Sequence, residues 1–346
     1  MYNMKTKLYY YLKTIESLLF IITSLLCFGS CVNNASDTKI LFAVNLEDGM
    51  AYFQSPTGKL FFCNRFNAVQ GFSEGLAAVE INGMWGFIDK EGKQVIPCIY
   101  DDVGSYSEGL APIEINGNWG YVDKSGKQAI PCIYEHVGSF SEGLAYVEIS
   151  GKYGFIDTKG NQVAPCIYDY AIPFFEGLAA VNINEKWGFI DKDGKQITSC
   201  IYDAAPFYLE GLIPIKHNGR WGYINKDGKQ VIPCIYDDNG LFTDGLAPIK
   251  LNGHWGFIDK TGKQIIPCIY DYADSFSGGL AFVKINGKEG AIDKNGQQVI
   301  PCIFDIISIF RNEYARIELN NMCGVINRAG EVVIPCVASE IYWEYD

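Results

Sequence analysis

The chain has 346 residues, 48% of them hydrophobic, which is enough to bury a core and excludes a disordered protein. Its formal net charge of -12 and pI near 4.8 exclude a nucleic-acid-binding protein, because phosphates require a basic face. Tyrosine, phenylalanine and glycine occur 22, 21 and 37 times against 5 methionines, a composition that favours strands and tight turns over helices.

The N-terminal segment differs from the rest of the chain and predicts export. Lysines precede an apolar run over residues 18–28, which is shorter than the ~20 residues that cross a bilayer and is typical of a signal peptide. We therefore assign residues 1–30 to an export signal. Gly29 and Ser30 precede Cys31, and this ending resembles the cleavage site of bacterial lipoproteins. The resemblance implies lipid attachment at Cys31; an ordinary cleaved signal and a retained membrane anchor are the alternatives.

The rest of the sequence repeats with a period of 34 residues, without an insertion or deletion. Glycine recurs from Gly86 to Gly324 and again from Gly92 to Gly330, and cysteine recurs from Cys98 to Cys336. Such a period indicates a tandem repeat protein. We divide the chain into a signal peptide (1–30), a lipid attachment site and tether (31–49), a partial first repeat (50–71), eight repeats (72–339) and a C-terminal tail (340–346).

The first full repeat predicts a hairpin. Residues 76–81 alternate so that Val79 and Ile81 share the buried face and Glu80 lies on the other, the pattern of a half-buried strand. Asn82-Gly83 is the pair that a type I′ turn prefers, since both residues need positive φ. The returning strand, residues 84–89, is apolar on both faces and is expected to be central.

A second turn and a third strand complete the unit. Residues 89–92 read as a type I turn followed by a left-handed glycine, the arrangement of a three-residue hairpin loop. Residues 93–100 form the third strand, in which Pro97 indicates an edge or a bulge. Each unit is therefore predicted to be a three-stranded meander.

Three motifs together resemble the bacterial WG repeat, named for its Trp-Gly pair, and the match covers residues 72–339: E-G-L-A, N-G-x-W-G-F-I-D-K-x-G-K and V-I-P-C-I-Y-D. A unit of this size cannot bury its apolar face alone, so neighbours must stack. We predict an all-β fold in which the repeats form an open superhelical array, with a closed β-propeller as the alternative. The open form is favoured because closure would place the degenerate last repeat against the partial first one.

No catalytic constellation, metal site or cofactor site is expected. His136, His217 and His254 lie at different offsets, so spacing assembles no triad or metal set. The repeat cysteines share one offset in an apolar strand and are expected to be small buried hydrophobes, with disulfides or a metal as alternatives. The acidic residues that begin at Asp101 are expected to close their own turns, with calcium binding as the alternative.

The tryptophans of the Trp-Gly pairs have two interpretations. The glycine beside each one leaves a slot into which a ring of the neighbouring repeat could pack, so stacking between repeats is favoured. A ladder of rings that binds sugars or peptides is the alternative.

Variable positions within the constant repeat are the candidate binding residues. Residue 80 and its equivalents change sign along the chain, and the position two residues earlier also varies. We expect these side chains to point into solvent and to align along the array. The candidate strip comprises Glu80, Glu114, Glu148, Lys216, Lys250, Lys284, Tyr146 and Phe282.

These observations predict a cell-envelope interaction protein that presents an extended repeat surface, rather than an enzyme, because no insertion breaks the regular repeat. The resemblance implies little more, since WG-repeat proteins are broadly of unassigned function. The expected partner is a protein or a glycan at the envelope. Nucleic acid is excluded, and contact with the membrane is expected through the lipid anchor alone. The alternatives are a carbohydrate-active hydrolase or its glycan-recruiting accessory lipoprotein, and a structural component of the envelope.

Overall fold

The structure is a computed structural model that describes residues 42–45, 51–54, 66–205, 208–311 and 313–341. The expected signal peptide, Cys31, most of the tether and the last residues of the tail lie outside these ranges. Among the described residues, no helix is long and apolar enough to span a bilayer.

Every repeat forms one small antiparallel sheet that contains the predicted meander. The first strands are β4 (Leu76–Ile81), β8 (Leu110–Ile115), β12 (Leu144–Ile149), β16 (Leu178–Ile183), β19 (Leu212–His217), β23 (Leu246–Leu251), β27 (Ala281–Ile285) and β31 (Tyr314–Leu319). The second strands are β5 (Met84–Asp89), β9 (Asn118–Asp123), β13 (Lys152–Asp157), β17 (Lys186–Asp191), β20 (Arg220–Asn225), β24 (His254–Asp259), β28 (Lys288–Ile292) and β32 (Met322–Asn327). The third strands are β6 (Gln94–Tyr100), β10 (Gln128–Tyr134), β14 (Gln162–Tyr168), β18 (Gln196–Tyr202), β21 (Gln230–Tyr236), β25 (Gln264–Tyr270), β29 (Gln298–Phe304) and β33 (Val332–Ala338).

A short strand that the sequence did not predict precedes most meanders and pairs with the first strand. In the first repeat this partner is the longer β3 (Ala68–Ser73), and in the fifth it is reduced to a bridge between Ala204 and Lys216. The partner therefore comes from the segment that links one meander to the next. The two-residue strands are β7 (Asp102–Val103), β11 (His136–Val137), β15 (Tyr170–Ala171), β22 (Asp238–Asn239), β26 (Tyr272–Ala273) and β30 (Ile306–Ile307).

A separate hairpin precedes the repeats. Strand β1 (Phe42–Asn45) pairs antiparallel with β2 (Ala51–Gln54). Strand β1 falls within residues 31–49, which we had assigned to a tether. Part of that segment is therefore paired in a sheet.

The predicted turns are confirmed by backbone geometry. Asn82 and Gly83 have φ values of 53° and 80°, as a type I′ turn requires. In the second turn Gly92 has a φ of 80°, and Asp89 Oδ1 accepts hydrogen bonds from the amides of Glu91 and Lys93.

The E-G-L-A motif contributes a further tight turn that the sequence analysis did not assign. Glu108 and Gly109 both have positive φ, and the backbone groups of Ser107 and Leu110 hydrogen-bond across them. This turn lies at the same end of the sheet as the turn between the second and third strands.

The glycine of the Trp-Gly pair allows the second and third strands to approach closely. A Cβ atom on Gly120 would lie 2.6 Å from the carbonyl oxygen of Ile130 and 2.7 Å from the amide nitrogen of Cys132. The register between β9 and β10 shifts at this place, so the third strand is bulged as well as at the edge, as its proline indicated. The slot beside the tryptophan is therefore filled by backbone rather than by a neighbouring ring. Stacking between repeats nevertheless occurs, since the Trp119 ring meets that of His136 and the Trp255 ring meets that of Tyr272 on the next sheet.

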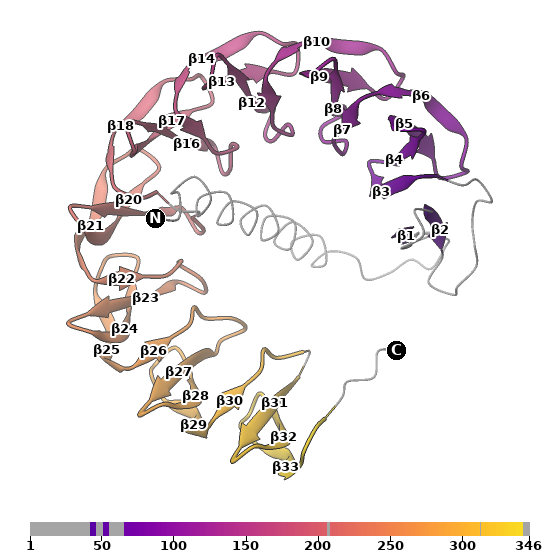
Figure 1. Ribbon diagram of the computed structural model, residues 1–346. Coiled ribbons are helices and arrows are strands. Elements are labelled where there is room, and N and C mark those ends of the chain that lie inside the picture. Colours follow the sequence, from indigo (N-terminus) through magenta and orange to yellow (C-terminus); the bar gives the residue numbers. More distant parts are fainter. Residues whose placement is uncertain (1–41, 46–50, 55–65, 206–207, 312, 342–346) are drawn as a thin grey trace, which may run out of the picture.

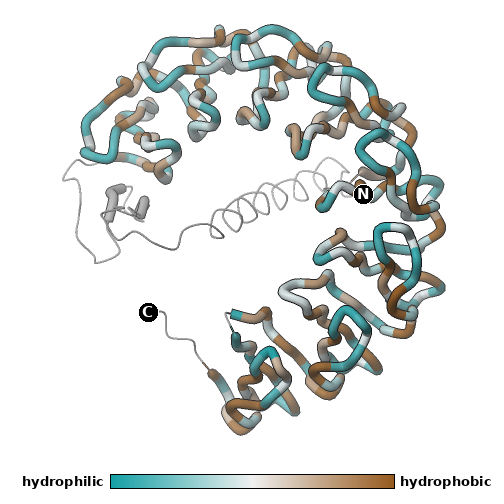
Figure 2. Tube along the Cα trace, turned by 180° about the vertical axis from the view of Figure 1, so that it is seen from behind, coloured by the Kyte–Doolittle hydropathy of each residue, from teal (hydrophilic) through white to brown (hydrophobic). Residues whose placement is uncertain are grey.

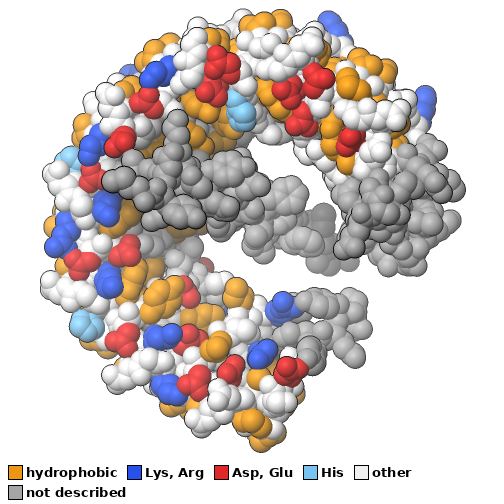
Figure 3. All heavy atoms as spheres, in the orientation of Figure 1, with side chains coloured by type: hydrophobic (Ala, Val, Ile, Leu, Met, Phe, Trp, Pro, Cys, Tyr) orange, Lys and Arg blue, Asp and Glu red, His pale blue; other side chains and the backbone are white. Residues whose placement is uncertain are grey.

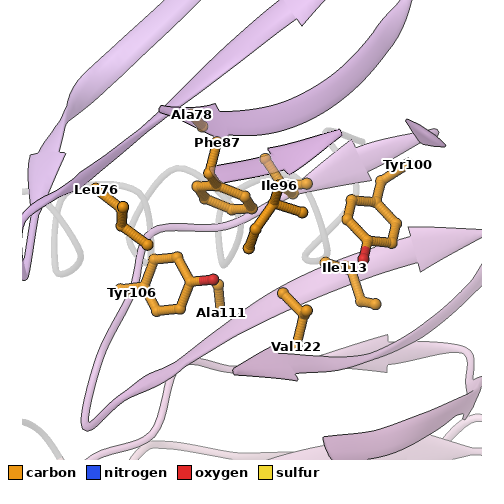
Figure 4. Close-up of a cluster of buried hydrophobic side chains, with 10 residues drawn as sticks. Leu76, Ala78, Phe87, Ile96, Tyr100, Tyr106, Ala111, Ile113 and Val122 are labelled. Atoms are coloured by element: carbon orange, nitrogen blue, oxygen red, sulfur yellow. The ribbon is translucent and has the colours of Figure 1, made fainter. Parts of the chain in front are cut away.

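The hydrophobic core lies between neighbouring sheets. One cluster joins Leu76, Phe87 and Tyr100 of the first repeat to Tyr106 and Ile113 of the second (Figure 4). The Phe87 and Tyr106 rings meet edge to face with centroids 4.9 Å apart. Equivalent clusters connect each later pair of sheets.

A sheet within the arc therefore has both of its faces covered by neighbouring sheets. Our expectation that the first strand is buried on one face only is wrong. Ala78, placed on the outer face by its alternation, is 2% exposed, whereas Ile81, expected in the core, is 38% exposed. Ile81 directly precedes the Asn-Gly turn, at the end of its sheet.

The sheets follow one another along an open arc (Figure 1). The third strands, such as β6, β10 and β14, lie on the outer, convex side, and the short strands lie toward the inner side. Hydrophilic turns and hydrophobic strand segments recur around the whole arc (Figure 2). Among the described residues, no hydrophobic cluster joins the sheet that begins with β3 to the sheet that ends with β33, and the two lie apart at the ends of the arc, so the open array is confirmed over the closed propeller.

Candidate functional site

The candidate charged residues occupy the same place in every sheet. Each is the second-last residue of the first strand of its sheet. On the second strand it lies opposite the residue that begins the Trp-Gly pair. We call the residues of the first strands the charged row and the residues opposite them the ring row. The opposed pairs are Glu80 and Trp85, Glu114 and Trp119, Glu148 and Tyr153, Asn182 and Trp187, Lys216 and Trp221, Lys250 and Trp255, Lys284 and Glu289, and Glu318 and Cys323.

The side chains of the charged row differ from the expected orientation, because they are half-buried rather than fully in solvent. Glu80, Glu114 and Glu148 are all of intermediate exposure, and Asn182 in the fourth repeat is buried. Their alternation places them on the same face as Ala78, which packs toward the next sheet. The row therefore lies along the end of the gap between neighbouring sheets, beside the Asn-Gly turns.

In the fifth and sixth repeats the lysines of the charged row lie over the rings opposite them. Lys216 Nζ is 5.5 Å from the centroid of Trp221, and Lys250 Nζ is 6.0 Å from that of Trp255. These distances are within the range of cation–π attraction. In the seventh repeat Glu289 replaces the ring and forms an ion pair with Lys284 at 3.1 Å.

A continuous run of aromatic rings extends the ring row across repeats two to four. His136 and Tyr170 come from the short strands and were not predicted as site residues. The neighbouring ring centroids are 5.4 to 6.4 Å apart. We call this set the aromatic run, and its members in order are Trp119, His136, Tyr146, Tyr153, Tyr170 and Trp187.

Glu148 interacts with this run directly. Burial raises the pKa of the Tyr153 hydroxyl, and the charge of Glu148 and its hydrogen bond with that hydroxyl raise the pKa further. The tyrosine is therefore neutral at physiological pH, and the carboxylate is positioned beside the rings.

The other variable series contains Tyr146 and Phe282. Its side chains do not form the row pointing into solvent that we expected. Ala78 and Ala180 are buried between sheets, and Phe282 packs in the last core cluster with its ring stacked on Phe310 at 5.8 Å. Tyr146 alone of the two candidates joins the aromatic run. Its ring fits there because residue 138 is a glycine, on which a Cβ would lie 2.4 Å from the ring.

The acidic residues after each third strand have a structural role that differs from the expected local turn. Asp101 Oδ2 accepts a hydrogen bond from the amide of Asn116, 15 residues further on, and Asp169 likewise accepts from Asn184. Lys152 of the same repeat as Asp169 forms an ion pair with it, and the same arrangement joins Lys186 to Asp203. These carboxylates therefore fix the turns between the first and second strands of adjacent repeats relative to each other.

The opposite rim carries a second set of links between repeats. Glu74 accepts a hydrogen bond from the amide of Gly109 and forms an ion pair with Lys124 at 3.0 Å. Acidic and basic side chains accordingly lie next to each other along the arc (Figure 3). The lysines and acids of the two rims mostly neutralise each other, which distinguishes them from the charged row.

The repeat cysteines are reduced thiols of intermediate exposure, rather than fully buried hydrophobes. Cys98 Sγ lies 3.6 Å from the carbonyl oxygen of Val79, and burial raises the pKa of its thiol. The described cysteines form no disulfide. A raised pKa reduces the thiolate fraction and therefore the reactivity of these cysteines.

A second surface that sequence reasoning missed lies on the third strands. The isoleucine that follows the repeat cysteine is exposed in each of the first seven repeats, for example by 57% at Ile99 and 60% at Ile133. The alternation along the third strand, in which the aromatic residue after it is buried, could have revealed it.

Within the described ranges, no group of three or more His, Cys, Asp or Glu side chains is placed to hold a metal ion. The three histidines lie apart, and His136 alone of them joins the aromatic run. The strongest concentration of variable chemistry is therefore the charged row with its rings.

Comparison with known proteins identifies the repeat. The family described as WG containing repeat matches eight consecutive segments between residues 65 and 323. No curated protein matches the chain.

Solved structures of several proteins are similar in part. A eukaryotic initiation factor aligns with 86% of this chain and 96% of its own, at 11% identity and a TM-score of 0.48. The extracellular domain of a putative hybrid two-component system from B. thetaiotaomicron aligns with 88% of this chain and 59% of its own, at 8% identity and a TM-score of 0.29. PorZ, a surface component of the type-IX secretion system of Porphyromonas gingivalis, aligns with 86% and 50%, at 12% identity and a TM-score of 0.30.

Proposed function

The chain belongs to the family of WG containing repeat proteins, and we propose that it is a non-catalytic interaction protein of the cell envelope. In this proposal the charged row and the aromatic run bind a protein or glycan partner along the inner half of the arc. The location at the envelope is proposed from the sequence, which predicts an export signal over residues 1–30 and lipid attachment at Cys31.

One observation carries the proposal: a constant backbone register presents different chemistry from repeat to repeat. Glu114 and Lys216 have the same opposed position and the same kind of ring beside them, yet opposite charges. Side chains that hold the repeats together, such as the acids of the turns, recur with the same partners along the arc. An aligned row whose chemistry varies over a constant frame is typical of a repeat surface that selects a partner.

The hydrolase alternative is less well supported by the residues. Glycosidases use a pair of carboxylates on either side of one bond, and their separation sets the mechanism. The acids of the charged row occur once per repeat, on separate sheets. The family is built from equal units, and none of these units carries an insertion that would create a distinct pocket.

Capture from native envelope extract tests the proposal with a matched control. In the row variant, all six charges of the candidate strip are changed to asparagine, the residue that the fourth repeat carries there. The control variant changes exposed charges at the opposite end of the sheets to asparagine. Its positions are Glu91, Asp193, Asp227, Lys127, Lys195 and Lys229.

We expect one partner to bind the wild-type chain and the control variant and to be lost from the row variant. Release by a free sugar would assign the partner to glycans. Capture that is equal for all three chains would contradict the proposed function. Location is tested separately, since palmitate labelling should mark the protein and Cys31→Ala should abolish the label.

A further inference from the structure

The fifth and sixth repeats contain a cation-binding arrangement that is filled from within the chain. Lys216 and Lys250 place their ammonium groups 5.5 and 6.0 Å from the centroids of the rings opposite them. The ring face carries a partial negative charge and attracts the cation. The lysines therefore show where a cation fits relative to the ring row of this protein.

The first three repeats retain the ring but replace the lysine with a glutamate. Trp85, Trp119 and Tyr153 lie opposite Glu80, Glu114 and Glu148 in the same register as the lysine repeats. All six of these side chains are of intermediate exposure. A ring face and a carboxylate both favour a cation, so each pair offers the attraction of the lysine repeats without their internal lysine.

We propose that these three ring–carboxylate pairs bind a basic segment of a partner protein, whose lysine or arginine side chains take the places that Lys216 and Lys250 fill in the later repeats. This inference rests on the proposed function and specifies its partner. The aromatic run extends the apolar wall beside the pairs, from Trp119 to Trp187. The stems of basic side chains can pack along such a wall while their charges reach the carboxylates.

The geometry of stacked sheets also constrains the sequence of the partner. Packed sheets are about 10 Å apart, and a polyproline II segment advances about 3.1 Å per residue with three residues in each turn. A basic residue at about every third position of such a segment would therefore meet successive repeats from one side. The net charge of -12 also attracts a basic segment over longer distances, and salt should weaken that attraction.

Synthetic peptides test the inference directly. The probe is a fluorescent peptide of serine and threonine with three lysines, one at every third position, and its control has the same composition with adjacent lysines. Binding to the chain from residue 32 onward is followed by fluorescence anisotropy. We expect the spaced peptide to bind more tightly and added salt to weaken it.

The decisive variant is Glu114→Lys with Glu148→Lys, which reproduces the internal arrangement of the fifth repeat and fills two of the three places. We expect the spaced peptide to bind about tenfold more weakly or worse, given the strength of a desolvated cation–π contact with its carboxylate. Glu91→Lys with Asp193→Lys is the matched control, because it changes the net charge equally on exposed turns at the other end of the sheets. This control should lose only the part of the affinity that salt also removes.

Equal weakening in both double variants, or none in the first, would overturn the inference. Should the first variant fail to fold, Glu114→Gln with Glu148→Gln must give a smaller loss in the same direction. A peptide that does not bind, while envelope capture still depends on the row, contradicts this inference and leaves the proposed function standing. Capture that ignores the row contradicts the proposed function itself. Displacement of the native partner by a neutral oligosaccharide would contradict the basic segment as well.

Discussion

Repeats one to three and repeats five and six differ in charge at one position of an otherwise equal frame. Glu114 and Lys216 are opposed to tryptophans in the same register, and the turns beside them have the same positive φ values. The fold therefore accepts either charge at this position. The difference teaches that the charged row is separable from the contacts that hold the arc together, so it can change with the partner at little structural cost.

The largest expected effect on stability comes from the glycines of the Trp-Gly pairs, and it should be equal in the glutamate repeats and in the lysine repeats. Gly120→Ala and Gly222→Ala each place a Cβ 2.6 Å from a carbonyl oxygen of the third strand, which must move. We expect each to lower the free energy of unfolding by about 1–3 kcal/mol, the usual cost of overpacking. Urea denaturation measures it. A loss at one glycine only would show that the two halves do not share one frame.

Acid should weaken the frame throughout the arc. The ammonium of Lys152, and then the amide of Asn184, hold the pKa of Asp169 below its ordinary value, and Asp305 is placed similarly by Lys288 and Asn320. A carboxylate with a lowered folded-state pKa contributes stability above its unfolded pKa of about 4 and loses it as pH falls through the folded value.

We therefore expect the midpoint of urea denaturation to fall between neutral pH and about pH 3. Asp169→Asn should reduce that pH dependence, because the titrating group is removed. Both pairs are partly exposed, so each contribution is small and only their sum along the arc is large. An unchanged midpoint in acid would mean that these links do not stabilise the frame.

The charged row should give the smallest change in stability, and the change should differ between the halves. Lys216→Ala removes a cation–π contact and should cost about 0.5–1 kcal/mol. Glu114→Ala removes a carboxylate that lies beside a ring without such a contact and should cost less. Paired denaturation curves check this order, and the reverse order would contradict our account of the row.

The repeat, its turns and its central strand could be predicted from the sequence because each depends on local chemistry. Asn82-Gly83 specifies its turn by itself, and Pro97 marks the edge and bulge of the third strand. The short strands could not be predicted, because two residues such as His136 and Val137 form a strand only when the first strand of the following repeat lies beside them.

Contacts between repeats were likewise hidden. The aromatic run joins Tyr153 to Tyr170 and Tyr170 to Trp187, and no spacing within one unit indicates which rings meet. The burial of the charged row and of Ala78 was also missed, since alternation describes a sheet with one free face whereas these sheets have a neighbour on both sides. Sequence therefore identified the row but not its surroundings.

Creating the site in the other half tests the central claim most directly. Lys216→Glu with Lys250→Glu should convert two internally filled places into open ring–carboxylate pairs, with Trp221 and Trp255 as the rings. Isothermal titration with the lysine-spaced peptide should then show a second, weaker binding event for each protein chain. Stoichiometry that stays at its wild-type value in a folded variant would contradict the claim that a ring and a carboxylate in this register suffice to bind a basic segment.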